Sequence, residues 1–310
     1  MTAKKILLST IALLLVSLAG LPAANVAETR RTEDLIYGRK SGMALTMDVF
    51  QPAKPNGCGI IYLVNGGWLS SKDTPRMENV QPEYYRRFLD RGYTVFAVVT
   101  SSQPVFTIPD LIRDVHRAVR YVRLNAGRFG VRPDRLGVTG SSSGGHLTLM
   151  AAAQADAGNP GSTDPVEKES SAVQAAACFF PPTDFLNYGG PGIDGCGVGR
   201  LAPLAVAFGP RATTESGRQS LGKEISPINY ITADLPPTLI IHGNADETVP
   251  LQQSESFVQR AKDAGVKNIE LIVREGKGHG WPKDSIVWKS DEDMKEIVDW
   301  FDRFLKSSSL

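Results

Sequence analysis

Cysteine is scarce in this sequence: 310 residues include three, at Cys58, Cys178 and Cys196. None belongs to a CxxC motif or pairs with a histidine at a metal-ligand spacing, so the sequence indicates no zinc site and we expect no metal. An odd count in an exported chain allows one disulfide and one free thiol. Cys178 and Cys196 are the closer pair; a disulfide between them and two buried unpaired thiols are equally consistent with the sequence.

The sequence also lacks an excess of charge of either sign. It has 34 lysines and arginines against 33 aspartates and glutamates, which gives a net charge of +1. Proteins that bind nucleic acids usually carry a basic excess or stripe, so we expect no nucleic-acid partner. We find no cofactor-binding motif and expect no cofactor. Beyond the N-terminal region, no stretch is apolar enough to span a bilayer.

The first 27 residues have the features of a secretory signal peptide. Two lysines precede an apolar run over residues 6–18, and small residues fill most of positions 19–24. A permanent membrane anchor is the alternative, but the apolar run is short for a span of about 20 residues and Pro22 follows it. We therefore expect cleavage near Ala23 or Ala27, export to the periplasm or the medium, and no stable membrane span afterwards.

Predicted strands alternate with predicted helices in the rest of the chain. Apolar runs of strand length indicate a mostly parallel sheet that helices cover on both faces. We predict a single α/β domain over residues 28–310. The predicted strands are 35–37, 44–50, 59–64, 93–99, 135–139, 173–180, 238–241 and 269–273, and the predicted helices are 83–91, 110–129, 147–153, 252–264 and 291–305.

One segment, about residues 186–228, interrupts this alternation. It is rich in glycine, proline and small residues and shows little helical or strand periodicity. Long stretches of this kind commonly serve a site as a lid or a binding loop. We predict a short, irregular, lid-like insertion here, and a surface insertion without a role in the site is the alternative.

Residues 140–144 read Gly-Ser-Ser-Ser-Gly and match the pattern G-x-S-x-G with Ser142 at its centre. This pattern belongs to a tight strand-to-helix turn that lifts a serine hydroxyl above a sheet, with small neighbours that let strand and helix approach. The context agrees, because a predicted strand precedes the motif and a helix of small residues follows it. Ser141 and Ser143 lack glycines at both flanking positions, so Ser142 is the predicted nucleophile.

A serine needs a base to take its proton, and the sequence has only four histidines. His116 lies among arginines on a predicted helix and is expected at the surface. His146, one turn beyond Ser142, is expected to pack against the sheet or a loop. His242 ends a strand just before Gly243 and is a candidate to orient the loop that carries the acid. His279 lies between glycines in the loop that joins the last predicted strand to the last predicted helix. We predict that His279 is the base.

The base in turn requires an acid that fixes its tautomer and stabilises the imidazolium formed during attack. Asp246 lies in the loop after the penultimate predicted strand. Glu247 and Asp184 are alternatives, but Asp184 follows an earlier strand and is more consistent with capping a helix or turn there. We predict that Ser142, Asp246 and His279 form a catalytic triad.

Hydrolysis through a tetrahedral intermediate also requires N–H donors that are aimed at the oxyanion. We expect the backbone N–H of Ser143 to supply one, because this residue directly follows the nucleophile. Gly66 and Gly67 follow an early buried strand and are expected to supply others, with a plain glycine turn as the alternative. The residues predicted to line the substrate pocket are Asn65, Trp68 and Trp281. For the two tryptophans, ordinary core packing is the alternative.

These motifs together resemble the α/β-hydrolase superfamily, specifically its hormone-sensitive-lipase-like and bacterial feruloyl-esterase-like branch of esterases. The resemblance covers about residues 35–305 and implies an α/β-hydrolase fold with the same triad, in the Ser–acid–His order of that fold. The matching positions are residues 114–123, 130–138, 140–146, 242–243, 246, 249–250 and 278–279.

The chain departs from this branch in two places. The oxyanion loop of the branch begins with histidine and often has three glycines before tryptophan, whereas this chain has Asn65 and two glycines. The alignment of the loop is therefore open by one residue, and the N–H of Trp68 is an alternative to that of Gly66. Ser101 and Ser102 replace a frequent Tyr-Arg pair, which bears on the shape of the pocket.

The predicted activity is hydrolysis of carboxylic esters through an acyl-enzyme. The expected partner is a small-molecule or carbohydrate ester, and export favours acetyl or feruloyl esters of polysaccharide fragments by analogy of fold. A serine peptidase or amidase of the prolyl-oligopeptidase-like type is one alternative, although such enzymes usually add a propeller domain that this chain is too short to hold. A non-catalytic binding protein on a hydrolase fold is another, against which the intact triad argues.

Overall fold

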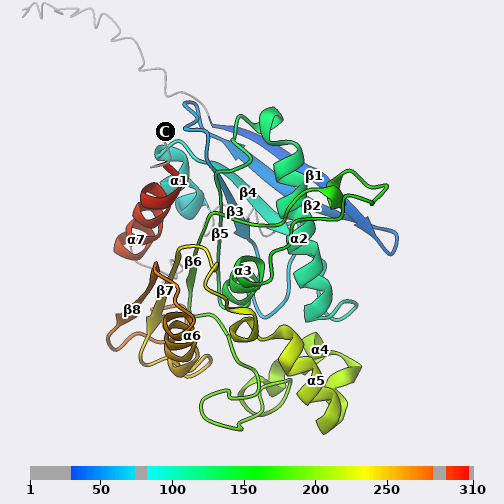
Figure 1. Ribbon diagram of the computed structural model, residues 1–310, viewed down its shortest axis with the longest axis vertical. Helices are drawn as coiled ribbons and strands as arrows, with labels where there is room; N and C mark the ends of the chain where they lie inside the picture. Colours follow the sequence, from blue (N-terminus) through cyan, green and yellow to red (C-terminus); the bar gives the residue numbers. More distant parts are fainter. Residues whose placement is uncertain (1–28, 74–81, 282–290, 307–310) are drawn as a thin grey trace, which may run out of the picture.

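The computed structural model of the protein describes residues 29–73, 82–281 and 291–306. The predicted signal peptide lies outside these residues. The described residues form a central sheet with helices on both of its faces (Figure 1). No helix among them is long and apolar enough to cross a membrane.

One sheet of eight strands organises the molecule, in the order β1-β2-β4-β3-β5-β6-β7-β8. β1 pairs with β2 and β2 with β4 in antiparallel fashion, and all other neighbours are parallel. The predicted opening hairpin and the mostly parallel sheet are therefore confirmed. The strands are β1 (Arg30–Lys40), β2 (Met43–Gln51), β3 (Gly59–Leu63), β4 (Thr94–Val99), β5 (Leu136–Ser141), β6 (Ala175–Phe179), β7 (Thr238–Gly243) and β8 (Ile269–Arg274).

The central parallel strands are buried along their whole length. Every residue of β3, β6 and β7 is buried, as is every residue of β4. Such strands read as unbroken apolar runs because helices cover both faces of the sheet. Since β5, β6, β7 and β8 run in parallel, their carboxyl ends meet at one edge, where the loops that follow them can carry a site.

Helices cover the sheet in two layers. Val119 of α2, Leu149 of α3 and Phe257 of α6 belong to the core on one face. Phe88 of α1 and Ile297 of α7 belong to the core on the other face, and these two helices stand together in Figure 1. The helices are α1 (Pro82–Asp90), α2 (Ile108–Leu124), α3 (Ser143–Ala153), α6 (Gln252–Asp263) and α7 (Asp291–Phe301).

The ends of α2 differ from the predicted range of 110–129. The helix starts at Ile108 because Thr107 and Asp110 bond reciprocally to each other's backbone in a capping box. It stops at Leu124, and the next residues form a 3₁₀ turn that Gly130 ends at φ +67°. Glycine adopts this left-handed conformation without strain, which suits it to the end of a helix.

Burial corrects one prediction and decides between two alternatives. His116 is 7% exposed and belongs to the buried face of α2, so the prediction of a surface residue is wrong. Burial lowers the pKa of this histidine to about 4, and nearby Arg120 contributes.

Cys178 and Cys196 are both free and buried, which excludes the disulfide between them. Burial raises the pKa of both thiols.

The segment over residues 186–228 contains regular structure where the sequence predicted little. The reason lies in α5, whose buried residues are few and include Gly222 beside Leu221 and Ile225, so its helical period is weak in the sequence. Thr214 caps this helix by accepting a hydrogen bond from the N–H of Gly217. The elements are the 3₁₀ turns Gly199–Leu204, Pro210–Thr213 and Pro227–Tyr230 and the helices α4 (Ala205–Phe208) and α5 (Glu215–Ile225).

Candidate active site

Ser142 occupies the tight turn between β5 and α3. Its backbone has φ +55° and ψ −121°, a region that L-residues rarely adopt. The surrounding hydrogen bonds hold it there, because its N–H donates to the carbonyl of Phe179 (3.0 Å) and its carbonyl accepts from the N–H of His146 (2.8 Å). Strained residues of this kind persist where the neighbouring structure fixes them, and they concentrate at functional sites.

Glycines make this turn sterically possible. A Cβ atom on Gly140 would lie 2.6 Å from the carbonyl oxygen of Gly144, and one on Gly145 would lie 2.8 Å from that of Phe179. Both contacts are with backbone atoms, which cannot rotate away as a flexible side chain can. Gly140 and Gly145 therefore allow α3 to start directly against β5 and β6.

The three predicted triad residues lie in one hydrogen-bonded chain. Nε2 of His279 is 3.0 Å from Oγ of Ser142, and Nδ1 of the same ring is 2.7 Å from Oδ2 of Asp246. The residues come from the connections that follow β5, β7 and β8, whose carboxyl ends meet at one edge of the sheet. If Asp246 is ionised, it accepts the Nδ1 proton of His279, which leaves Nε2 free to accept the Ser142 hydroxyl.

Asp246 is held in its ionised form by hydrogen bonds. Its side chain is fully buried, and Oδ1 accepts from the N–H groups of Thr248 (2.9 Å) and Val249 (2.8 Å). Burial works to raise the pKa of this carboxyl, but the hydrogen bonds from His242 and His279 outweigh it and keep the pKa well below the usual range. The carboxylate is thus available to orient and stabilise a protonated imidazole.

The two alternative acids are placed elsewhere. Glu247 is exposed, with its backbone carbonyl bonded to Nη1 of Arg200. Asp184 accepts from the N–H of Leu186 (3.1 Å) and from the amide of Asn187 (2.8 Å), so it stabilises a turn, as the sequence indicated. Asp246 is the acid that contacts His279.

Phe180 is a residue of this site that the sequence analysis missed. It follows β6 with φ +35°, is fully buried, and places its ring centroid 4.6 Å from that of His279. The ring therefore covers one side of the imidazole and limits its rotation. A signal was available, because Phe180 directly follows a buried strand at the same edge of the sheet as Ser142.

Backbone donors for an oxyanion come from two places. Ser143 is the first residue of α3, and the first N–H groups of a helix have no partner inside it. The prediction that Gly66 supplies a donor is wrong, because its N–H is already bonded to the carbonyl of Leu69 (3.0 Å). Within residues 29–73, 82–281 and 291–306, no group accepts from the N–H of Gly67 or Trp68. These two, with Ser143, are the candidate donors.

Asn65 and Trp68 hold the oxyanion loop: Asn65 is half-buried, whereas Trp68 is a core residue, which corrects its predicted role in the pocket. Oδ1 of Asn65 accepts from the hydroxyl of Ser143 (2.7 Å), so the loop is tied to the nucleophile turn. Trp68 is 1% exposed, and its Nε1–H donates to Nδ1 of His146 (3.2 Å). Nε2 of His146 bonds to the carbonyl of Ile225 (2.7 Å), which connects α3 to the end of α5.

Trp281 is also a core residue, so its predicted role in the pocket is wrong. It is 5% exposed and packs edge-on against Phe179 and Phe180. Its Nε1–H donates to Oδ2 of Asp293 on α7 (2.7 Å). The tryptophan therefore anchors the His279 loop to the last helix.

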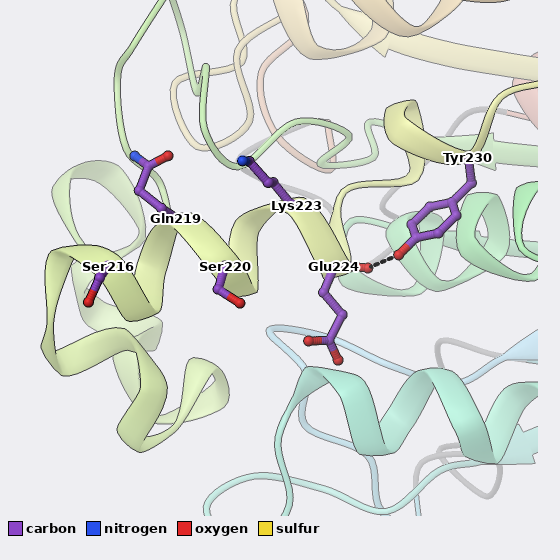
Figure 2. A pocket seen from close by; sticks show the side chains of 6 residues that line it. All are labelled: Ser216, Gln219, Ser220, Lys223, Glu224 and Tyr230. Carbon is purple, nitrogen blue, oxygen red and sulfur yellow. Dashed lines mark hydrogen bonds between the residues drawn. The ribbon is translucent and has the colours of Figure 1, made fainter.

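A cavity of about 770 Å³ lies on the insertion, and none of its lining residues belongs to the triad (Figure 2). Most of its side chains project from different sides of α5, and Tyr230 comes from the 3₁₀ turn that follows, where its hydroxyl donates to the carbonyl of Glu224 (2.9 Å). The lining residues are Ser216, Gln219, Ser220, Lys223, Glu224 and Tyr230. In the described part of the chain, no three His, Cys, Asp or Glu side chains are grouped closely enough to hold a metal ion.

The sequence model of one protein family, BD-FAE, matches residues 47–261, which is more than half of the chain. The chain belongs to the BD-FAE family. This is a family of α/β-hydrolase esterases, so the resemblance drawn from the motifs is confirmed. The matched range includes Ser142 and Asp246, and His279 follows it.

This BD-FAE chain is similar to two esterases of Mycobacterium tuberculosis. It is 28% identical to "Esterase LipQ", over 86% of this chain and 61% of that protein. It is 31% identical to "Probable carboxylic ester hydrolase LipM", over 74% of this chain and 51% of that protein. The chain thus spans between half and two thirds of the length of these relatives.

Among solved structures, the BD-FAE chain is similar to a "Truncated form of carbohydrate esterase from gut microbiota". The two superpose with a TM-score of 0.75 and are 26% identical. The match covers 92% of this chain and 99% of the other. The α/β-hydrolase fold is therefore shared over nearly all of both chains.

Proposed function

We propose that this BD-FAE protein hydrolyses carboxylic esters with Ser142 as the nucleophile. The observation that carries the proposal is the hydrogen-bonded chain from Asp246 through His279 to Ser142. Relatives that are named esterases and an esterase family support the same reaction. A serine without such a base is a poor nucleophile at neutral pH.

The first half of the reaction acylates the serine. Oγ of Ser142 attacks the carbonyl carbon of the ester while Nε2 of His279 accepts the hydroxyl proton. The N–H groups of Ser143, Gly67 and Trp68 stabilise the oxyanion that forms. His279 then gives its proton to the alcohol oxygen, the C–O bond breaks, the alcohol leaves, and the acyl group stays on the serine.

The second half restores the enzyme. His279 takes a proton from a water molecule, whose oxygen attacks the acyl carbon. The bond to Ser142 then breaks, Oγ recovers the proton from His279, and the carboxylic acid is released. Asp246 keeps its negative charge throughout and stabilises the imidazolium in both halves of the reaction.

The insertion over residues 186–228 is proposed as the wall of the substrate pocket. It contacts the loops on both sides of the triad: Arg200 bonds to the carbonyl of Glu247 (2.6 Å), and the Tyr188 hydroxyl donates to that of Thr248 (3.2 Å). On the oxyanion side, a Cβ on Gly67 would lie 3.2 Å from a methyl group of Leu204. A segment in these positions selects substrates by shape.

We place acetyl or feruloyl esters of carbohydrates first as substrates, because a similar solved structure is a carbohydrate esterase. Export fits such a substrate, and the signal-peptide features of the first 27 residues support export of the protein. A peptidase or amidase with the same triad is the second candidate, and a hydrolase-fold protein without activity is the third.

Turnover of model substrates tests the reaction class. The mature protein should hydrolyse p-nitrophenyl acetate and butyrate faster than an aminoacyl anilide, and acetylated or feruloylated oligosaccharides should be cleaved as well. Ser142→Ala should abolish ester turnover, while the matched control Ser141→Ala, on the neighbouring serine, should retain it. Faster cleavage of the anilide would establish the peptidase alternative. Ester turnover that survives Ser142→Ala would exclude the proposed nucleophile.

A further inference from the structure

His242 is a fully buried histidine next to the triad that the proposed reaction does not use. It is the penultimate residue of β7, with no exposed surface. Both ring nitrogens are bonded: Nδ1 lies 2.6 Å from Oγ of Ser254, and Nε2 lies 2.9 Å from the carbonyl oxygen of Val249. Nε2 also lies 3.4 Å from Oδ2 of Asp246.

These partners determine where the ring carries its proton. A carbonyl oxygen only accepts hydrogen bonds, so the bond to Val249 requires a proton on Nε2. In the neutral ring Nδ1 is then an acceptor and takes the hydroxyl proton of Ser254, which is itself buried on α6. The N–H of His242 is therefore fixed on the side of the ring that faces the Asp246 carboxylate.

The carboxylate oxygen that His242 faces is the one that binds the base. Oδ2 of Asp246 accepts the Nδ1 proton of His279 at 2.7 Å, while Oδ1 is occupied by the N–H groups of Thr248 and Val249. Resting on the proposed triad, we propose that His242 is a positioning residue, which orients Oδ2 of Asp246 toward His279 and limits the basicity of that oxygen.

The other groups around the contact between His242 and Asp246 are either apolar or bonded elsewhere. The ring of Phe180, which is apolar, lies 6.4 Å from that of His242, and Ser254 is the α6 side chain bonded to it. From the insertion, the hydroxyl of Tyr188 is bonded to the backbone of the acid loop, and so is the guanidinium of Arg200. Asp246 and His279 are thus the titratable groups that His242 acts upon.

Two polar substitutions of similar size separate the role of the Nε2 proton from simple packing. The amide of His242→Gln reaches the place of Nε2 and can still donate toward Asp246. The shorter amide of His242→Asn reaches only the place of Nδ1, so it keeps the hydrogen bond with Ser254 and loses the contact with Asp246. His116→Asn removes another buried imidazole, on α2 and outside the site, and is the matched control for the loss of a buried ring.

We expect His242→Asn to lower kcat by about tenfold or more with little change in KM, because Asp246 no longer holds the base in place. Without the donor, Oδ2 becomes a stronger partner for the imidazolium of His279. The acidic limb of the kcat/KM profile should therefore move to higher pH. His242→Gln should restore both values to near those of the unchanged protein, and His116→Asn should leave the limb where it is.

A proton NMR measurement on the substrate-free protein makes the test independent of turnover. The downfield signal of the His279 Nδ1 proton should shift in His242→Asn and stay in place in His242→Gln. If the Asn variant does not fold, Ser254→Ala should move the signal in the same direction by a smaller amount, because it frees the ring to rotate. Unchanged signals and profiles in the folded variants would overturn the proposal. A protein with the shifted signal and no ester turnover would instead refute the proposed function alone.

Discussion

At the scale of single residues, the site depends on the hydrogen-bond donors that surround the carboxylate of Asp246. Four N–H groups face its two oxygens: those of Thr248 and Val249 at Oδ1 and those of His279 and His242 at Oδ2. A buried carboxylate without such donors would be protonated at neutral pH, because burial disfavours its charge. The hydrogen bonds therefore maintain the charge that the base needs.

Asp246→Asn tests this arrangement with almost no change in volume. The neutral amide cannot stabilise the imidazolium and can bind the wrong tautomer of His279, so we expect kcat on p-nitrophenyl acetate to fall by about 10³- to 10⁴-fold. KM should change little, because the acid does not touch the ester. Glu247→Gln, on the exposed neighbour, is the matched control and should keep its activity. A small loss in Asp246→Asn would contradict the assigned acid.

Sequence alone identified Ser142, Asp246 and His279 because each lies in a short motif or a loop whose place in the chain follows from the order of strands. It did not identify the role of Phe180, whose ring contact with His279 joins segments far apart in the chain. For His242 it indicated a role in orienting the acid loop, but not the contact between Nε2 and the carboxylate of Asp246. Trp68 and Trp281 were misassigned to the pocket for the same reason. Their burial depends on how loops fold over the sheet, which local pattern does not determine.

At the scale of elements, β5 and α3 approach each other at the turn between them more closely than a side chain on Gly140 would allow. Gly140→Ala would place a Cβ 2.6 Å from a backbone oxygen. Overpacking of this kind typically costs 1–3 kcal/mol, so we expect the free energy of unfolding to fall by about 2 kcal/mol or more. Urea unfolding monitored by circular dichroism measures it.

Gly127→Ala is the control for this substitution, because a Cβ there meets no atom within 4 Å. Alanine favours helical backbone over glycine by up to about 1 kcal/mol, so this variant should be as stable as the unchanged protein or slightly more stable. Equal losses in both variants would show that the close approach in the turn is not what requires glycine.

Strands and helices could be predicted where their sequences show a strong hydrophobic pattern. β3 and β4 are continuous apolar runs, and both lie close to their predicted ranges. The helix α5 was missed because its buried side is short and includes a glycine, while capping by Thr107 shifted the start of α2. Weak periods and local caps are thus what separated the prediction from the structure.

At the scale of the whole molecule, two buried histidines make the fold sensitive to acid. Burial lowers the pKa of His116 and of His146 to about 4. In the unfolded chain the pKa is about 6.5, so between pH 6.5 and 4 the unfolded state binds more protons. Stability therefore rises with pH across this window and is lost as the pH falls through it.

We expect the free energy of unfolding to be lower near pH 5 than near pH 7.5 by about 2 kcal/mol for each of these histidines. His116→Leu should reduce this difference by about half. Among the described residues, no group is hydrogen-bonded to the ring nitrogens of His116, so an apolar side chain should cost little near pH 7.5. Urea unfolding at both pH values tests this, and an unchanged pH dependence in His116→Leu would contradict the assignment.

The most direct test of the central claim is covalent labelling of the nucleophile. A p-nitrophenyl organophosphate should form one adduct per chain, releasing p-nitrophenol in equal amount, and peptide mass spectrometry should place the adduct on Ser142. Ser142→Ala should stay unlabelled, and His279→Ala should react far more slowly because the serine loses its base. An adduct on another residue, or equal labelling of Ser142→Ala, would contradict the account of this site as a serine hydrolase centred on Ser142.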